Sequence, residues 1–319
     1  MPTLAIGMLV LGAVVAMATL ALWRQRDALI RAEFNRQRHA AGLQRCTLDA
    51  AGHRWVLACR DASSADAATI VMLHGYTGSK ENWYPLVRAL APQHRLLIPD
   101  LPGWGESERK PGQAYGFVEQ AAHVAALIQT LSPERPVVLL GHSMGGGIAA
   151  LAAARYPQLI ARVGLLNAAG VRFADNAFGL AVLAGENPFA VTDTASLQRY
   201  VNAVFHRDQA KPWIPWPASR ALIAQRRRDA AFEQSVLDSI GRSDDAMLPG
   251  DAATAIGQPT LLLWGRQDAI IDPSAMALYA ARIPQAQQVL LEDCGHMSLV
   301  EHPRDVAVAV AALMAPAFP

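Results

Sequence analysis

One serine in this sequence has the setting of a catalytic nucleophile. Ser143 is the centre of the pentapeptide Gly-His-Ser-Met-Gly at 141–145, which follows an apolar run and precedes a stretch of small residues. A G-x-S-x-G turn between a buried strand and a helix strains its serine and exposes the hydroxyl at the carboxyl end of the strand. The flanking glycines let the neighbouring backbone pass without a clashing Cβ. The segment therefore predicts a nucleophile rather than an ordinary strand-to-helix turn.

A serine hydroxyl is a poor nucleophile until a neighbouring base takes its proton. Of the nine histidines, His296 has the right placement, in the loop directly after the last strand-like run at 287–291, so we predict that it is the base. His142 adjoins the serine, so its side chain should point away from the hydroxyl and have a structural role. His302 precedes Pro303 at a predicted helix start, and we expect it at the surface.

The imidazole in turn needs a carboxylate that fixes its tautomer and stabilises its cation. Asp268 follows the apolar run 259–264 on a loop and is the predicted acid, with Asp272 as the rival. The strand-like run before it ends in Asn167, so a carboxylate is not available from that strand end.

Attack by a serine on a carbonyl group creates an oxyanion, which two aimed N–H groups must stabilise. We expect one from the backbone of Met144, directly after the nucleophile, and the other from Tyr76, in the loop after the first long strand-like run. Loss of one such donor typically raises the barrier by about 3 kcal/mol. No metal cluster, P-loop or G-x-G-x-x-G after a strand is visible in the sequence, so the predicted mechanism needs no metal and no cofactor.

The elements that must position these residues alternate along the chain. Helical segments rich in Ala and Leu separate apolar strand-like runs at 69–73, 95–98, 136–140, 163–167, 259–264 and 287–291. Runs this apolar are typical of strands buried on both faces, and the alternation predicts a mostly parallel α/β sheet with helices on both faces. A short hairpin, 46–48 with 54–59, precedes them. The rhythm stops between about 171 and 256, where we predict an inserted helical cap.

The N-terminus has the pattern of a membrane anchor. Residues 3–23 carry no charge, and Trp23 ends the run before several arginines. The length suits a helix that crosses a bilayer, and Trp is favoured at the interface. We predict a transmembrane anchor at 1–24, a juxtamembrane helix or linker at 25–44 and the main domain at 45–319. A signal peptide would need a positive start and a shorter apolar core, and a buried core helix would rarely be free of charge for so long.

Charge and cysteine content bear on partners and compartment. The net charge is +1, which gives no argument for nucleic-acid binding. The positive-inside rule places the arginine side, and with it the main domain, in the cytoplasm. Cys46 and Cys59 flank the predicted hairpin turn and could face each other, but we interpret them as two small apolar strand residues. A disulfide would require an oxidising compartment and would contradict the cytoplasmic orientation.

The predicted cap contains aromatic and cationic residues whose roles are open. Phe205, Trp213 and Trp216 are the predicted substrate-binding residues, and the last two lie in a proline-rich stretch. They either line an acyl pocket, enter the membrane interface or pack as core. The three arginines at 226–228 either face anionic lipid or form a solvated helix face.

From about residue 45 to 315 the chain resembles an α/β-hydrolase-fold protein. The resemblance rests on the chain order of Ser143, Asp268 and His296, on His-Gly at 74–75 and on Asp-Leu-Pro-Gly-Trp-Gly-Glu-Ser at 100–107. It implies the parallel sheet, the inserted cap and the roles assigned above to the three residues.

A narrower resemblance is to membrane-anchored monoacylglycerol lipases with a single N-terminal span and to the bacterial lipases similar to them. It rests on the anchor and on Lys-Glu-Asn-Trp at 80–83, Asn-Ala-Ala-Gly at 167–170, Glu-Asn-Pro-Phe at 186–189, Trp-Gly-Arg-Gln-Asp at 264–268 and Leu-Glu-Asp-Cys-Gly-His at 291–296. The resemblance implies that the serine is acylated by a monoglyceride or a similar lipid ester. The cap diverges more readily than the core, so the acyl chain length and the head group are not implied.

We therefore expect a serine carboxylic ester hydrolase that acts on lipid esters. A carbon–carbon hydrolase of ring-cleavage products uses the same triad, but its substrates are soluble and acidic, so a membrane anchor would be unexplained. A ligand receptor or scaffold on a hydrolase fold belongs to a different class. Such proteins can lose triad members, whereas all three are in place here.

Overall fold

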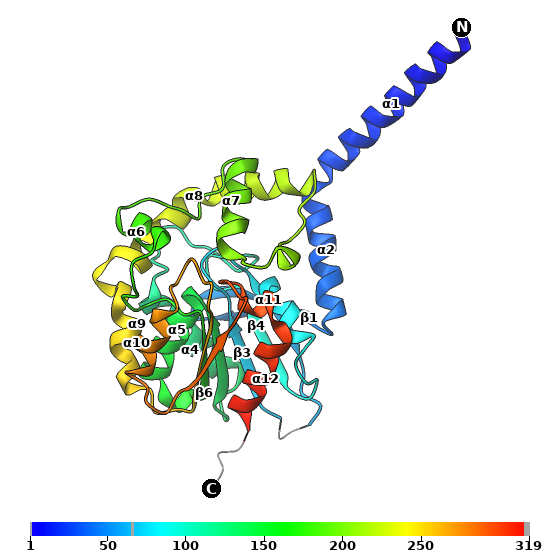
Figure 1. The fold of residues 1–319 in the computed structure, drawn as a ribbon. Helices are drawn as coiled ribbons and strands as arrows, with labels where there is room; N and C mark the ends of the chain where they lie inside the picture. The colour runs from blue at the N-terminus through cyan, green and yellow to red at the C-terminus, as the bar shows by residue number, and fades with distance from the viewer. Residues whose placement is uncertain (1, 65–66, 316–319) are drawn as a thin grey trace.

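The computed structural model describes residues 2–64 and 67–315. Its centre is an eight-stranded sheet in the order β1-β2-β4-β3-β5-β6-β7-β8 (Figure 1). The strands are β1 Gln44–Ala50, β2 His53–Arg60, β3 Thr69–Leu73, β4 Arg95–Pro99, β5 Val137–His142, β6 Ile160–Leu166, β7 Thr260–Gly265 and β8 Gln287–Leu291. β1 and β2 form the predicted hairpin, and β2 is antiparallel to β4; all the other neighbours are parallel. The predicted fold class is confirmed.

Helices cover both faces of the sheet because successive strand residues point to opposite sides. In β3 and β5, Val71 and Leu139 belong to one apolar layer, while their neighbours Met72 and Leu140 belong to the other. The first layer packs under α4 Phe117–Leu131, α5 Met144–Arg155 and α10 Ser274–Ala280. The second packs under α3 Tyr84–Val87, α11 Ser298–Glu301 and α12 Pro303–Met314.

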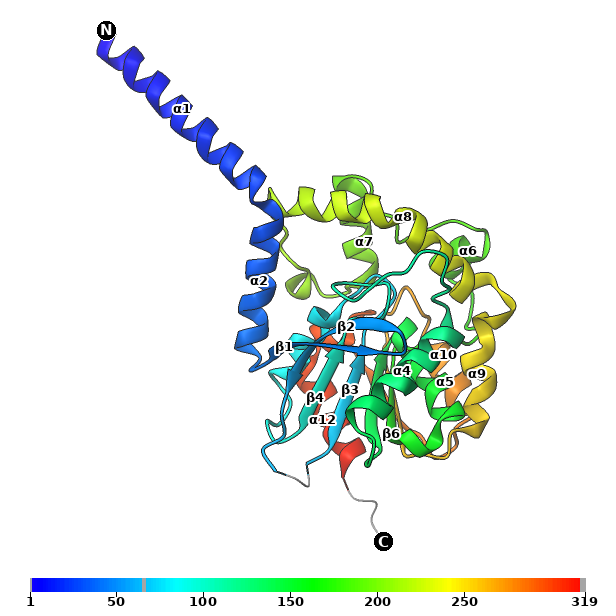
Figure 2. The same cartoon turned by 180° about the vertical axis from the view of Figure 1, so that it is seen from behind.

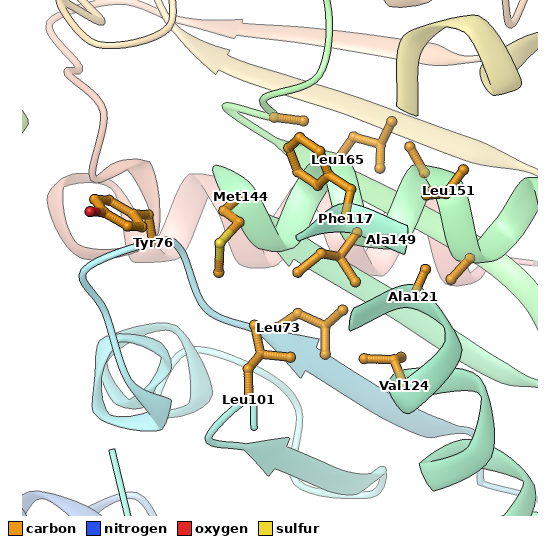
Figure 3. Close-up of a cluster of buried hydrophobic side chains, with 14 of the residues drawn as sticks. Leu73, Tyr76, Leu101, Phe117, Ala121, Val124, Met144, Ala149, Leu151 and Leu165 are labelled. Carbon is orange, nitrogen blue, oxygen red and sulfur yellow. The ribbon is translucent and has the colours of Figure 1, made fainter. Parts of the chain in front are cut away.

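The helix after β5 lies very close to its neighbours because its facing residues are small. A Cβ on Gly147 would lie 2.5 Å from Cε1 of Phe117, so the Phe117 ring of α4 packs directly against the backbone of α5 at this point. Figure 3 shows Phe117 of α4 beside Ala149 of α5, with Met144 and Tyr76 at one end of the same apolar cluster. The first turn of α5, which follows the predicted nucleophile, is therefore held rigidly by the core.

The long segment between β6 and β7 consists of helices, as predicted. They are α6 Ala177–Leu183, α7 Thr194–Val204, α8 Ala218–Arg242 and α9 Leu248–Ala252. Helices α6, α7 and α8 lie beyond one end of the strands (Figure 1). We call this insertion, residues 167–259, the cap. Contacts to Tyr76 after β3 and Trp104 after β4 show that it covers the carboxyl ends of the parallel strands.

Two helices precede the sheet. α1 Pro2–Arg24 projects away from the rest of the chain in both views, and α2 Arg26–Ala40 runs beside the β1 edge (Figures 1 and 2). The stretch Ile6–Arg24 is long and apolar enough to cross a membrane, and none of it is buried against the protein. α1 is therefore a candidate membrane span rather than a core helix of the described chain.

The hairpin carries a disulfide between Cys46 and Cys59, whose Cα atoms are 6.3 Å apart. The interpretation of these residues as two unpaired strand residues is therefore wrong. Cys46 lies opposite Leu57 and Cys59 lies opposite Gln44, so the two cysteines are diagonal neighbours across the ladder. A diagonal pair of this kind depends on the strand register, which the sequence spacing alone does not determine.

Candidate active site

Ser143 lies at the sharp turn that the sequence predicts. It follows β5, precedes α5 and has φ +56°, a backbone conformation that serine rarely adopts. The helix after this turn lies close to β3, which requires a glycine at position 145: a Cβ on Gly145 would collide with the carbonyl oxygen of Leu73. A Cβ on Gly75, in the next loop, would lie 3.0 Å from Cβ of Ser143. The turn is therefore closely packed on both sides, which fixes the position of the serine side chain.

His296 and Asp268 form a buried pair beside this turn. Nδ1 of His296 lies 2.8 Å from Oδ2 of Asp268, and both residues are only 4% exposed. The other carboxylate oxygen accepts the backbone N–H groups of Ile270 and Ile271 at 2.9 and 3.0 Å. Asp272, the rival acid, instead accepts the N–H of Ser274 at the start of α10.

Asn167 forms a hydrogen bond to the Asp268 carboxylate, a role that the sequence did not reveal. Its Nδ2 donates to the same Oδ2 of Asp268 at 2.8 Å, and Ser298 Oγ donates to its Oδ1 at 2.7 Å. Asn167 is fully buried and has φ +49°, which asparagine tolerates better than most residues. The available signal was its place at the carboxyl end of β6, next to β7 in the sheet.

His142 has a structural role, but a specific one. Its Nε2 lies 2.7 Å from the backbone carbonyl oxygen of His296, and the two rings are 4.8 Å apart. Burial, and then the nearby His296, lower the pKa of His142 to about 3, so the ring is neutral at neutral pH. A carbonyl oxygen only accepts, so Nε2 carries the proton. His142 therefore links the serine turn to the loop that holds His296. His302 is not part of this contact; its two ring nitrogens lie within hydrogen-bond distance of the Asp293 carbonyl oxygen and the Asp305 carboxylate.

Tyr76 and Met144, the predicted oxyanion donors, line one cavity together with Ser143. Hydrogen bonds hold both the backbone and the side chain of Tyr76. Its backbone carbonyl accepts from the indole N–H of Trp104, and its hydroxyl donates to the carbonyl oxygen of Glu233 in α8. The position of this backbone is therefore coupled both to the loop after β4 and to the cap.

A buried ion cluster holds the same loop to the sheet. Lys80 is 2% exposed, and its Nζ lies 2.7 Å from Asp100 and 2.9 Å from Glu106. Burial opposes the charge on the lysine, but Asp100 and Glu81 more than offset it and raise the pKa of Lys80. The cluster therefore remains charged and joins the segment after β3 to the segment after β4.

The cavity above Ser143 has mostly apolar walls, and the cap supplies most of them. Its lining includes Phe178 and Leu183 around α6, Phe189, and Leu237 and Ile240 of α8. In the described part of the chain, the predicted substrate-binding residues are not among the lining residues. Phe205 is buried at the end of α7, whereas Trp213 and Trp216 are 87% and 46% exposed. An acyl-pocket role for these three residues therefore has no support from this cavity, because aromatic content does not tell which way a cap loop faces.

The three arginines at 226–228 do not act as one group. Arg226 is buried, lies 2.9 Å from Glu233 and donates to the carbonyl oxygen of Phe189. Arg227 and Arg228 are exposed on α8. Within the described ranges, 2–64 and 67–315, no group of three or more His, Cys, Asp or Glu residues is arranged to hold a metal ion.

The fold and the arrangement at the turn match a known family. The family model described as alpha/beta hydrolase fold covers residues 68–303. The chain belongs to the α/β-hydrolase fold family. The sequence resemblance to this family is thus confirmed, and the relatives named next confirm its narrower form, a likeness to lipases.

Curated relatives and a solved structure are similar over most of the chain. Lipase 1 of Psychrobacter immobilis is 29% identical over 236 residues, which are 73% of this chain and 72% of the relative. Monoacylglycerol lipase ABHD6 of Mus musculus is 26% identical and covers 77% of this chain and 75% of its own. The crystal structure of a membrane phospholipase A, described as a bacterial virulence factor, superposes with TM-score 0.83 at 29% identity and covers 98% of each chain.

Proposed function

We propose that this α/β hydrolase is a serine carboxylic ester hydrolase that cleaves lipid esters, with acylglycerols of medium or long chain as the substrate class. The observation that carries the proposal is the strained Ser143 in the floor of an apolar, cap-covered cavity, beside the His296–Asp268 pair. An apolar cavity favours an acyl chain over a charged substrate. The similarity to lipases and to a monoacylglycerol lipase supports the same substrate class.

The proposed mechanism passes through an acyl-enzyme. Ser143 Oγ attacks the ester carbonyl carbon while His296 takes its proton, and Asp268 stabilises the resulting imidazolium. The backbone N–H groups of Tyr76 and Met144 stabilise the oxyanion. The imidazolium then gives its proton to the leaving alkoxide, and the alcohol departs. Water deprotonated by His296 attacks the acyl-enzyme, which releases the fatty acid and restores Ser143.

A substrate panel tests this proposal. The purified protein should hydrolyse monoglycerides, triglycerides and p-nitrophenyl esters of graded chain length, and the preferred chain length should reveal the depth of the cavity. Ser143→Ala should lower kcat for every active substrate by at least about 10³-fold. Esterase activity that survives in Ser143→Ala would contradict the assignment of the nucleophile. Turnover of a vinylogous diketo acid but of no ester would favour the carbon–carbon hydrolase instead.

The Cys46–Cys59 disulfide bears on the side of the membrane at which the domain works. Arginines after α1 predict a cytoplasmic domain, but cytosolic thiols are kept reduced. The disulfide supports the opposite orientation, so we propose that the domain lies on the oxidising side of the membrane. Titration of protein denatured without reductant should then detect one thiol, Cys294. Detection of all three thiols would restore the cytoplasmic prediction.

A further inference from the structure

The distribution of tryptophan over the structure is uneven. Four of the seven tryptophans are buried: Trp55, Trp83, Trp104 and Trp264. The other three, Trp23, Trp213 and Trp216, are 40%, 87% and 46% exposed. Trp23 lies at the end of the candidate span, and Trp213 and Trp216 lie in one loop of the cap; we call these three exposed residues the tryptophan patch.

The patch is built by contact between distant parts of the chain. The rings of Trp23 and Trp216 are stacked, with centroids 6.5 Å apart and an interplanar angle of 18°. Trp213 is only three residues from Trp216 in the same loop, which connects α7 to α8. Figures 1 and 2 both show the start of α8 at the junction of α1 and α2, and α2 packs against α8.

The position of the patch favours a lipid bilayer as its binding partner. Trp23 ends the apolar stretch of α1, where a spanning helix leaves the hydrocarbon and tryptophan is favoured. A ring stacked on Trp23 lies at the same depth, so Trp216 also meets the head-group region. The exposed Arg24 and Arg220 lie next to the patch in sequence, and their charge suits anionic head groups.

The loop is well suited to stay in such a position. Pro212, Pro215 and Pro217 alternate with the aromatic residues of the loop, and each fixes its own φ angle. A stiff loop loses little conformational freedom when it binds. Trp213 is 87% exposed, which is unfavourable for an apolar ring in water. At a membrane interface the ring can contact lipid while its N–H still finds a hydrogen-bond partner.

We propose that the tryptophan patch docks the cap on the bilayer surface as a second membrane contact beside α1. The consequence for the cavity rests on the function proposed above. α8 begins at Ala218, directly after the loop, and its Leu237 and Ile240 line the cavity above Ser143. Docking at one end of this helix therefore fixes the position of the cavity roof relative to the lipid surface.

Fluorescence quenching tests the docking without any assay of activity. The full chain is reconstituted in vesicles of phosphatidylcholine and phosphatidylglycerol that contain brominated lipid, which quenches tryptophans near the bilayer. The double variant W213F/W216F should show a clearly smaller quenched fraction than the wild-type protein, because Trp23 alone then remains at the interface. An unchanged quenched fraction would overturn the proposal. Self-association of the detergent-solubilised chain that W213A/W216A abolishes, together with unchanged quenching, would assign the patch to a second copy.

Activity on two substrates tests the consequence for the site. In the same vesicles, W213A/W216A should hydrolyse bilayer-embedded monoglyceride at least about three-fold more slowly, and a soluble p-nitrophenyl ester at the wild-type rate. Val308→Ala is the matched control, since Val308 is 70% exposed on α12 but belongs to another face. If W213A/W216A hydrolysed both substrates at the wild-type rates, the coupling between the patch and the cavity would be overturned. If the wild-type protein hydrolysed neither substrate, the result would instead contradict the proposed function.

Discussion

Asn167 shows how a neutral side chain can serve a charged pair. Its amide donates to the oxygen of Asp268 that also contacts His296, while Ser298 holds the amide in place. An amide orients the carboxylate and adds no charge. A carboxylate in the same place would set a second negative charge beside Asp268, and like charges at hydrogen-bond distance strongly disfavour each other.

Substitution at this position separates an orienting role from a packing role. In Asn167→Asp the added carboxylate should stabilise the imidazolium form of His296. The acidic limb of the kcat/KM profile for a soluble ester should therefore move to higher pH, by about one unit, and the rate at a pH well down that limb should fall about ten-fold. Ser298→Ala removes only the hydrogen bond to Asn167 and should leave the limb in place. An unshifted limb in Asn167→Asp would exclude the electrostatic role.

The segment after β3 is held in place by contacts to distant parts of the chain. Tyr76 hydrogen-bonds to Trp104 and to α8, and Lys80 joins the loop to Asp100 after β4. These contacts link three segments that are far apart in sequence. Removal of one partner of a buried ion cluster lowers the free energy of unfolding strongly, because an unpaired charge then remains in the interior.

Lys80→Met should destabilise the protein by about 3–5 kcal/mol, since it leaves the Asp100 carboxylate buried without its cation. The double variant Lys80→Met with Asp100→Leu should recover a large part of this loss. Denaturant unfolding of the detergent-solubilised chain measures both. The control is Arg36→Ala on α2: its ion pair with Glu33 has side chains 68% and 46% exposed, so the change should stay within about 0.5 kcal/mol. A loss in Lys80→Met as small as in the control would contradict the assigned role.

The chain as a whole should lose stability in mild acid. Burial lowers the pKa of His142 to about 3 and that of His74 to about 4, whereas unfolding restores ordinary values near 6.5. Below pH 6.5 the unfolded chain therefore binds more protons, so stability falls as the pH drops from 6.5 toward 3–4. Between pH 7 and 5 each histidine contributes a loss of up to about 2 kcal/mol. Thermal melting at the two pH values checks this, and a smaller loss in His142→Gln identifies its share.

Local patterns in the sequence predicted most of the molecule. Buried strands, alternating helices and the elbow around Ser143 are recognisable within short windows, and the pairing of His296 with Asp268 agrees with their chain order. The remaining features depend on contacts between distant segments. His142 meets His296 across 154 residues, Asn167 meets Asp268 across 101, and the Cys46–Cys59 disulfide depends on strand register.

The cap was least predictable because its helices follow no sheet-imposed alternation. Aromatic content indicated that Phe205, Trp213 and Trp216 matter, but not which of them face the cavity, the core or solvent. In the structure, other cap residues form the cavity walls, and Trp216 stacks on Trp23 at the end of the candidate span instead.

The most direct test of the central claim is covalent labelling of the full-length protein with a fluorophosphonate, followed by peptide mapping. An activated serine attacks the phosphorus and keeps the phosphonyl group, whereas ordinary serines do not react. The account predicts a single modified residue, Ser143, with loss of labelling in Ser143→Ala and in His296→Ala. Labelling at another serine, or undiminished labelling of Ser143→Ala, would contradict it.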